Sequence, residues 1–266
     1  MIKAAVLGSP IEHSLSPFIH NRAYEILGID GKYEKFEIDV ETFPEFIASA
    51  SSLDWDGFSL TMPLKEVAFG MGFECDSRAK KIHSVNTLVR SGNSYKASST
   101  DVLAFDRILD GMHFNNVAVI GGGGTARAAL AALDGRVSAL TILQRSDKRN
   151  ELLLACLDKT DLIFAPMQTS LDSFDLVIST TPAGVSDIFV STLSKSAGTL
   201  VESLYKPWPT KLSAAWRENG GKVVHGLDLL VEQALDQISF MTHQSFDYAS
   251  MRETLLADVL EANSMR

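Results

Sequence analysis

The chain has 266 residues, of which 45% are hydrophobic and 21% charged, and its formal net charge is −9. This length supports one large domain or two modest ones, and the composition is that of a globular protein rather than a disordered one. A net negative charge argues against a general nucleic-acid binder, which needs a basic surface to displace counterions. Small anionic ligands stay possible, because local fields can oppose the overall charge.

The cysteines, histidines and apolar runs narrow the class further. Cys75 and Cys156 are the only two cysteines, and neither they nor the six scattered histidines have the spacing of metal ligands. The apolar run at the N-terminus is too short for a signal peptide, and no run approaches the roughly 20 residues that a membrane span requires. We therefore expect a reduced, cytoplasmic protein without a metal centre or a membrane partner, as a monomer or a homodimer.

Short apolar runs alternate with helical patterns along the first hundred residues. The predicted elements are strands at residues 4–7, 32–38, 57–61, 87–90 and 94–97, and helices at residues 17–27 and 43–50. The last two strands flank Gly92 and Asn93, which is typical of a hairpin. This alternation predicts an α/β fold.

A second series of strands and helices begins after Gly111. Its predicted strands lie at residues 117–120, 139–143, 162–164, 176–179, 199–201 and 222–224, with an alanine-rich helix through about residue 133 and helical sequence from about residue 229. Two α/β domains with a hinge near residues 101–111 account for both series.

A glycine-rich turn follows the strand predicted at residues 117–120. Gly121, Gly123 and Ala126 fit the G-x-G-x-x-G/A pattern, between a predicted strand and a predicted helix. Such a turn lets the backbone approach a pyrophosphate, whose charge is then met by free N–H groups at the start of the helix. The predicted phosphate cradle consists of Gly121, Gly122, Gly123, Gly124, Thr125 and Ala126.

The end of the strand at residues 139–143 distinguishes NAD from NADP. An NAD-binding unit usually has an acidic residue there, which bonds the ribose hydroxyls. This chain has Gln144 and Arg145 instead, and an arginine suits a 2′-phosphate. Ser146 and Lys148 add further donors, although Asp147 partly cancels the charge and a solvated basic turn is the alternative. The pattern favours NADP.

Polar residues in the first domain offer groups for chemistry. Ser14 and Ser16 would both face one side of an extended segment, although Ser16 also suits a helix cap before Pro17. Lys65 follows a strand end and a proline turn, and a lone lysine is usually solvated. A ketone reductase, however, needs a proton donor beside the carbonyl, and a lysine held by an aspartate such as Asp101 can supply that proton.

Seven short motifs occur in order along nearly the whole chain. They are Gly8-Ser9-Pro10 with His13-Ser14-Leu15-Ser16-Pro17, Thr61-Met62-Pro63-Leu64-Lys65, Ser84-Val85-Asn86-Thr87-Leu88, Ser99-Thr100-Asp101, the glycine turn, Tyr205-Lys206-Pro207-Trp208-Pro209-Thr210, and Gly226-Leu227-Asp228-Leu229-Leu230 with Gln233-Ala234. Each motif is modest, but the ordered set resembles the shikimate dehydrogenase family.

The resemblance implies NADPH-dependent reduction of 3-dehydroshikimate to shikimate, a step of aromatic amino-acid biosynthesis, with Lys65 and Asp101 as the catalytic pair. It also implies a substrate domain at residues 1–101, onto which residues 231–266 pack back, and a Rossmann-like NADP-binding domain at residues 102–230. The implied substrate contacts are Ser14, Ser16, Thr61, Asn86, Tyr205 and Gln233. Thr180 and Gly226 are implied as further cofactor contacts.

Two departures from the family's pattern concern the substrate. The family usually reads Asn-Val-Thr where this chain has Ser59-Leu60-Thr61, and it has an asparagine where this chain has Ser99. That second change removes an amide that could anchor the loop around Asp101, and Ser99 can replace one of its hydrogen bonds but not both roles. A dehydrogenase for quinate or an amino-substituted relative therefore stays open. From another class, so does a non-catalytic NADP-binding regulatory protein, although retention of both Lys65 and Asp101 argues against it.

Overall fold

The computed structural model describes residues 1–50, 54–194 and 198–264. Two compact units are present, the first comprising Met1–Ala104 and Leu230–Arg266 and the second Phe105–Leu229. Both divisions fall inside helices, namely α5 (Thr100–Ile108) and α9 (Gly226–Thr242).

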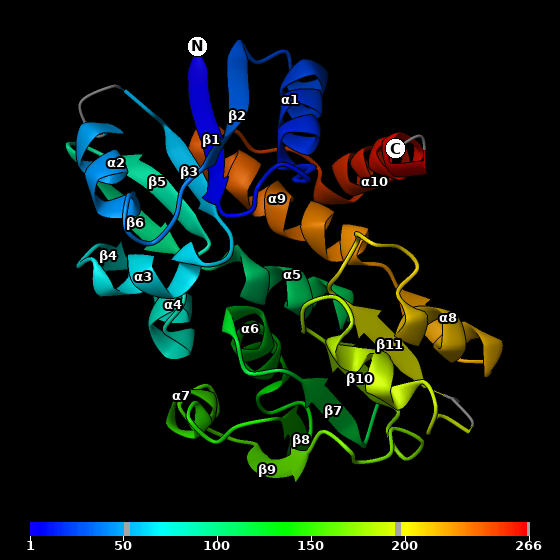
Figure 1. Ribbon diagram of the computed structural model, residues 1–266. Coiled ribbons are helices and arrows are strands. Elements are labelled where there is room, and N and C mark those ends of the chain that lie inside the picture. Colours follow the sequence, from blue (N-terminus) through cyan, green and yellow to red (C-terminus); the bar gives the residue numbers. More distant parts are fainter. Residues whose placement is uncertain (51–53, 195–197, 265–266) are drawn as a thin grey trace. The chain divides into compact units, whose positions relative to one another are not determined.

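The first unit is built on a mixed six-stranded sheet with the order β2-β1-β3-β5-β6-β4 (Figure 1). The strands are β1 (Ile2–Gly8), β2 (Gly31–Glu37), β3 (Gly57–Leu60), β4 (Glu74–Cys75), β5 (Thr87–Ser91) and β6 (Ser94–Ser98). Ser91 pairs with Ser94, so Gly92 and Asn93 form the turn, and Gly92 has the positive φ of 62° that such turns favour. The predicted hairpin is confirmed.

The strand directions bring several polar segments to one end of this sheet. β3 ends there at Leu60, and β5, which is antiparallel to β3, begins there directly after Asn86. Since β6 is antiparallel to β5, it ends there as well, just before residues 99–101. Thr61, Asn86 and residues 99–101, far apart in the sequence, are therefore neighbours at this end.

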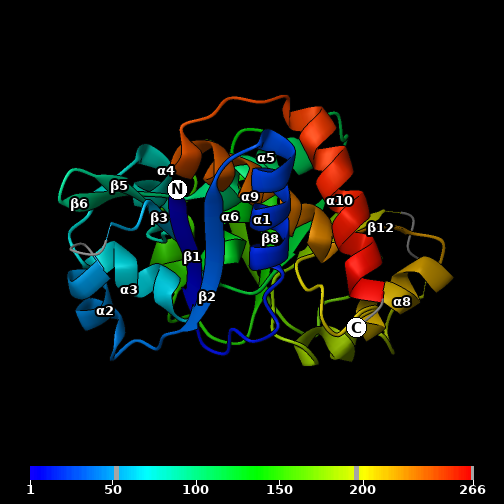
Figure 2. The same cartoon turned by 90° about the horizontal axis from the view of Figure 1, so that it is seen from above.

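Besides the first part of α5, the helices of the first unit are α1 (Ser16–Leu27), α2 (Phe43–Ala50), α3 (Leu64–Gly70), α4 (Ser77–Ile82), most of α9, and α10 (Tyr248–Ser264). A buried cluster joins β1, β3, α2 and α3 through Leu7, Phe58, Ile47 and Leu64. α10 lies alongside α1 (Figure 2), where Arg22 Nε donates to Asp258 Oδ2 at 2.7 Å.

The second unit contains a parallel six-stranded sheet with the order β12-β11-β10-β7-β8-β9. The strands are β7 (Val117–Ile120), β8 (Ala139–Gln144), β9 (Asp161–Pro166), β10 (Leu176–Ser179), β11 (Thr199–Glu202) and β12 (Lys222–Val224). Its other elements include α6 (Gly124–Leu133), α7 (Asn150–Leu154), the 3₁₀ helix η1 (Val185–Phe189) and α8 (Lys211–Glu218). This is the doubly wound order, whose direction reverses between β7 and β10, and ligands of such sheets bind at that reversal.

β7 and β10 are buried along their whole length. Central strands of a parallel sheet are covered on both faces, which explains their continuous apolar sequences. The predicted α/β class is confirmed.

Across residues 1–50, 54–194 and 198–264, no helix has both the length and the hydrophobicity to cross a membrane. In the same ranges, His, Cys, Asp and Glu side chains form no group of three or more that could hold a metal ion.

Candidate active site

Lys65 and Asp101 form an ion pair within the first unit. Lys65 is the second residue of α3, and its Nζ donates to Oδ2 of Asp101, the second residue of α5, at 2.6 Å. The side chains keep 19% and 8% exposure, so the pair is largely withdrawn from water but can be reached by a ligand. The Lys65 carbonyl also accepts the N–H of Val85 at 2.9 Å. A charge-assisted hydrogen bond in this setting gives the ammonium a defined direction.

Asn86 holds the other oxygen of the Asp101 carboxylate. Its Nδ2 donates to Asp101 Oδ1 and to Thr100 Oγ1, each at 2.9 Å. Its Oδ1 accepts the backbone N–H of Thr100 at 2.8 Å, and this backbone donor fixes which side of the amide is oxygen. The backbone N–H of Asn86 donates to Ser98 O at 3.1 Å. Asn86 therefore anchors the turn that carries Asp101.

Ser99 does not have the role that we predicted from the sequence. It is 1% exposed, and its Oγ has no hydrogen-bond partner among the described residues. The expected replacement hydrogen bond is therefore wrong, because Asn86, directly before β5, already supplies both the donor and the acceptor to this turn. α5 begins at Thr100, directly after Ser99.

Gln233 and Thr61 lie at the same end of the sheet. Gln233 is buried on α9, where its Oε1 is 3.5 Å from Asn86 Nδ2 and its Nε2 donates to Leu230 O at 2.8 Å. Thr61 directly follows β3, and its N–H donates to Leu7 O at 3.0 Å. Hydrogen bonds thus connect four predicted site residues in the first unit, namely Lys65, Asp101, Asn86 and Gln233.

The segment with Ser14 and Ser16 differs from the sequence prediction. Leu15 has φ −94° and ψ −2°, which is helical, so the expectation of an extended segment with both hydroxyls on one side is wrong. Ser16 does not cap the helix either, because α1 begins at Ser16 itself. Ser14 Oγ instead accepts the N–H of Ser16 at 3.3 Å.

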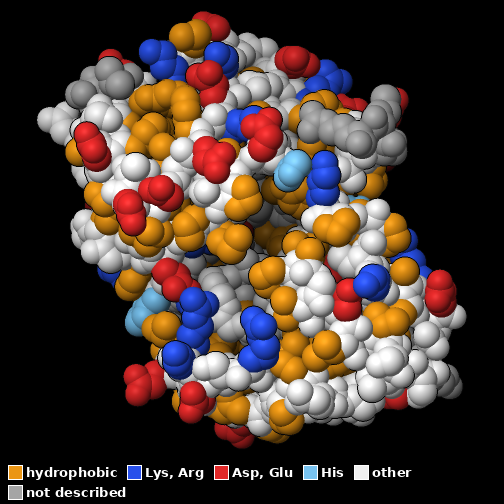
Figure 3. Space-filling model, viewed as in Figure 1, with side chains coloured by type: hydrophobic (Ala, Val, Ile, Leu, Met, Phe, Trp, Pro, Cys, Tyr) orange, Lys and Arg blue, Asp and Glu red, His pale blue; other side chains and the backbone are white. Residues whose placement is uncertain are grey.

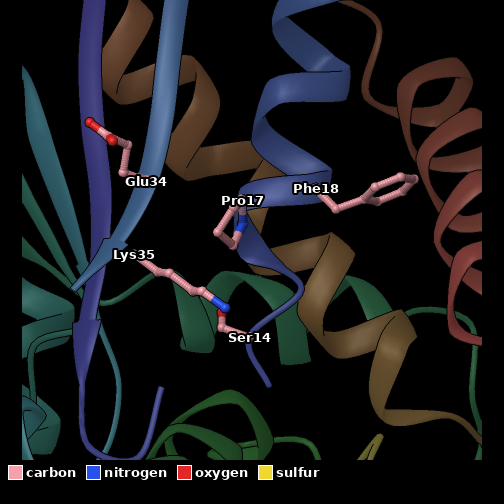
Figure 4. Close-up of a pocket in the computed structure, with 5 residues that line it drawn as sticks. All are labelled: Ser14, Pro17, Phe18, Glu34 and Lys35. Atoms are coloured by element: carbon pink, nitrogen blue, oxygen red, sulfur yellow. The ribbon is translucent and has the colours of Figure 1, made fainter. Parts of the chain in front are cut away.

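A pocket borders Ser14, with Pro17, Phe18, Glu34 and Lys35 as its other lining residues. Figure 4 shows the Lys35 side chain extending from β2 toward Ser14, while Glu34 points to the other side. Lys35 Nζ donates to the carbonyl and to Oε1 of Glu12 at 2.7 and 2.9 Å, and this bond lowers the pKa of the Glu12 carboxyl. The sequence did not single out Lys35, because a lysine in a strand is usually a solvated residue.

The glycine turn of the second unit connects β7 to α6. Gly121 has φ 114°, and a Cβ at this position would lie 2.6 Å from Thr180 Oγ1, so both conformation and space require glycine. Gly123 precedes α6 and has no side chain to cap its N-terminus. The first amides of α6 therefore present the positive end of the helix, which fits a pyrophosphate.

Thr180 connects β10 to β7, the two strands between which the sheet order reverses. It follows β10, and its N–H and Oγ1 both donate to Ile120 O of β7, at 3.0 and 2.7 Å. The two strand ends that flank the glycine turn are thereby held together.

Exposed cations lie beyond the end of β8, namely Arg145, Lys148 and Arg149. Figure 3 shows lysine and arginine side chains gathered in the region of α7. Sequence reasoning missed Arg149, whose NH1 donates to Gly122 O at 3.2 Å and which thus connects this cluster to the glycine turn. The sequence feature that could have indicated Arg149 is its position in the same basic stretch as Arg145. Gln144 Nε2 donates to Asn150 Oδ1 at 2.5 Å, so this side chain contacts the start of α7.

Tyr205 lies in the loop after β11 in the second unit. Glu202, which is buried, accepts the N–H of Leu204 at 3.2 Å and the hydroxyl of Thr210 at 3.1 Å, and burial raises the pKa of its carboxyl. These bonds fix both sides of the Tyr205 loop. Gly226 has a packing role beside its predicted cofactor role, because a Cβ there would meet the backbone of Leu204.

Known proteins are similar to this chain in sequence and in fold. Residues 6–88 match the family model of the shikimate dehydrogenase substrate binding domain. The NADP⁺ shikimate dehydrogenase of Bacillus cereus (strain 03BB102) is 31% identical over 245 residues, covering 86% of this chain and 88% of that protein. The Mycobacterium tuberculosis shikimate dehydrogenase structure has a TM-score of 0.86 and 32% identity, covering 97% of this chain and 100% of that one. The Thermus thermophilus shikimate 5-dehydrogenase structure in complex with NADP(H) and shikimate has a TM-score of 0.82 and 26% identity, covering 96% and 98%.

Proposed function

The chain belongs to the shikimate dehydrogenase family, and on that basis we propose that it reduces 3-dehydroshikimate to shikimate with NADPH. It is an NADP-dependent oxidoreductase, as are the relatives that carry this name. This reaction belongs to aromatic amino-acid biosynthesis. The observation that carries the proposal is the Lys65–Asp101 ion pair, held on its far side by Asn86.

Bound NADPH supplies the hydride. Lys65 donates a proton from Nζ to the carbonyl oxygen of the substrate as that carbon is reduced, and in the reverse reaction Nζ accepts the proton of the hydroxyl. One hydrogen of the ammonium is engaged with Asp101, which leaves the others for the substrate. Because Asn86 holds the second carboxylate oxygen, the direction of the ammonium is set before the substrate arrives.

We assign the carboxylate and hydroxyls of the substrate to six polar side chains. The proposed contacts are Ser14, Ser16, Thr61, Asn86, Tyr205 and Gln233. The convergence of Thr61 and Asn86 at the end of the sheet that also carries Asp101 supports this assignment.

We assign the cofactor to the second unit. Gly121, Gly122, Gly123, Gly124, Thr125 and Ala126 hold the pyrophosphate, with Gln144, Arg145, Ser146, Lys148, Thr180 and Gly226 as the other contacts. Arg149 joins this set because it contacts the glycine turn. The exposed guanidinium of Arg145 at the end of β8 receives the 2′-phosphate.

A spectrophotometric assay tests the function. Purified protein should oxidise NADPH when 3-dehydroshikimate is added, with a higher kcat/KM than for NADH or for the oxidised forms of quinate and the amino analogue. Arg145→Ala should reduce the preference for NADPH over NADH by about 10-fold, the effect of one lost phosphate contact. A protein that binds NADPH but never oxidises it with 3-dehydroshikimate would contradict the proposal.

We propose that the protein acts in the cytoplasm, as a monomer or a homodimer, and that it binds small molecules rather than nucleic acid or a membrane. Cys75 and Cys156 are both buried thiols that do not form a disulfide, which supports a reducing compartment. Sedimentation equilibrium would decide between the two oligomeric states.

A further inference from the structure

A buried series of hydrogen bonds extends from Asn86 away from the catalytic pair. Gln237 Nε2 donates to Thr87 Oγ1 at 3.1 Å and to the backbone carbonyl of Asn86 at 3.3 Å. Thr87 Oγ1 in turn donates to Asn86 Oδ1 at 2.8 Å. On the other side, Gln237 Oε1 accepts from Ser59 Oγ at 2.7 Å, and Ser59 accepts from the phenol of Tyr33 at 2.5 Å.

The direction of these bonds is fixed by a group that can only accept. The carbonyl oxygen of Asn86 requires a donor, so the Gln237 atom beside it is the nitrogen. Thr87 therefore accepts from Gln237 and gives its own proton to Asn86 Oδ1. This leaves Asn86 Nδ2 to donate to Asp101, whose second oxygen accepts from Lys65.

Apart from the Lys65–Asp101 ion pair, the side chains of the series are uncharged and buried from solvent. Tyr33, Ser59, Asn86, Thr87 and Gln237 have exposures between 0% and 4%. Burial raises the pKa of the Tyr33 phenol, so this end of the series keeps its proton. Hydrogen bonds between buried groups are strong, and losing one partner leaves the other unsatisfied.

We propose that Gln237 is a positioning residue for the reaction, acting through Thr87 and Asn86 on the Asp101 carboxylate and, through it, on Lys65. This inference rests on the proposed function. Gln237 lies one helical turn after Gln233 on α9, and both side chains contact Asn86, so α9 fixes the asparagine at two points. The Lys65 ammonium is thus oriented in part by α9, which begins more than a hundred residues after Asp101 in the sequence.

Two substitutions interrupt the series while keeping side-chain volume. Gln237→Met removes both polar atoms, and Thr87→Val replaces the hydroxyl by a methyl group. We expect each to lower kcat about 10-fold, the effect of one lost buried hydrogen bond, without changing the affinity for NADPH. The double variant should be no slower than the slower single variant, because both changes interrupt one series.

Two matched variants separate positioning from general destabilisation. Thr87→Ser keeps the hydroxyl and should retain kcat within about twofold. Thr242→Val removes a buried hydroxyl from the same helix, where Thr242 Oγ1 donates to Ile238 O at 2.7 Å, and should lower the melting temperature without lowering kcat.

Unchanged kcat in either folded single variant, or a double variant slowed by the product of the single effects, would overturn the role of Gln237 and leave the proposed function standing. A wild-type protein without activity on 3-dehydroshikimate would overturn both. If Gln237→Met does not fold, Thr87→Val against Thr87→Ser tests the same connection, and equal kcat values would overturn it.

Discussion

In the first unit the proposed catalytic centre consists of side chains that already hydrogen-bond one another, whereas in the second unit the proposed phosphate cradle consists of backbone. The Lys65 ammonium, the Asp101 carboxylate and the Asn86 amide occupy fixed positions around one end of the mixed sheet. After β7, by contrast, Gly121 and Gly123 expose the amides at the start of α6.

This contrast implies opposite sensitivities to mutation. A site made of side chains fails when an atom is removed, because a buried partner loses its hydrogen bond. A site made of backbone fails when an atom is added, because a Cβ occupies the space that the ligand or a neighbouring strand needs. We therefore expect the first unit to be sensitive to the removal of side-chain atoms and the glycine turn of the second unit to be sensitive to an added Cβ.

The largest effect should follow removal of the Lys65 amine. Lys65→Met keeps the length of the side chain but has no proton to donate, so we expect kcat to fall about a thousandfold. The affinity for NADPH should stay unchanged, because the glycine turn lies in the other unit. Stopped-flow or steady-state NADPH oxidation measures the first quantity and fluorescence titration the second. Lys96→Met, at an exposed lysine paired with Glu74, is the matched control. A kcat within tenfold of wild type would refute the assigned role of Lys65.

The second unit should respond to one added methyl group. In Gly121→Ala the Cβ meets Thr180 Oγ1 at 2.6 Å in a backbone of φ 114°, and we expect the affinity for NADPH to fall about 100-fold. Gly135→Ala is the control, because Gly135 also has a positive φ of 80° but its nearest neighbour is the flexible Lys159 side chain. Equal losses of NADPH affinity in the two variants would show that strain alone, rather than the cradle, is responsible.

The stability of the first unit should depend on pH through His20. This histidine is fully buried and stacks on Tyr33 at a centroid distance of 3.8 Å, and burial lowers its pKa from 6.5 to about 3. Below pH 6.5 His20 is protonated in the unfolded chain, whereas in the folded chain it stays neutral until the pH approaches 3. The free energy of unfolding therefore falls as the pH is lowered from 6.5 toward 3, by about 2 kcal/mol at pH 5.

Urea unfolding at pH 7 and pH 5 measures this difference. His20→Phe keeps an aromatic ring against Tyr33 and should lose the His20 contribution, so its stability should fall less between the two pH values. His243→Asn, at an exposed histidine, should behave as the wild type does. An identical decrease in wild type and His20→Phe would contradict the prediction.

Several elements have the bounds that their apolar patterns predict. Residues 43–50 coincide with α2, and the strands at residues 117–120 and 176–179 coincide with β7 and β10. α3, α4, α7 and α8 were missed. The first three have only 5 to 7 residues, which form no more than two helical turns, so no period can be recognised.

The site was predictable where its residues stand in local motifs, and not where they act through distant partners. Lys65 follows a recognisable turn, and Asp101 precedes a helical pattern. Gln237 lies 150 positions from Thr87, and nothing near it in the sequence indicates that contact. Ser16 and Ser99 were misjudged for a related reason, since a serine hydroxyl has many possible partners and only the fold selects one.

The smallest effect on stability concerns Ser99, which, like Ser59, stands where the family usually has an asparagine. Its buried Oγ has no hydrogen-bond partner among the described residues, so Ser99→Ala removes an unsatisfied group and should raise the free energy of unfolding by up to about 1 kcal/mol without altering kcat. Ser59 is also buried but bonds Tyr33 and Gln237, so Ser59→Ala should lower that free energy by about 1–3 kcal/mol. Urea unfolding of both variants at pH 7 measures the two changes. Equal destabilisation would mean that Ser99 has a partner in solution, whereas opposite signs would agree with a hydrogen-bonded Ser59 and an unbonded Ser99.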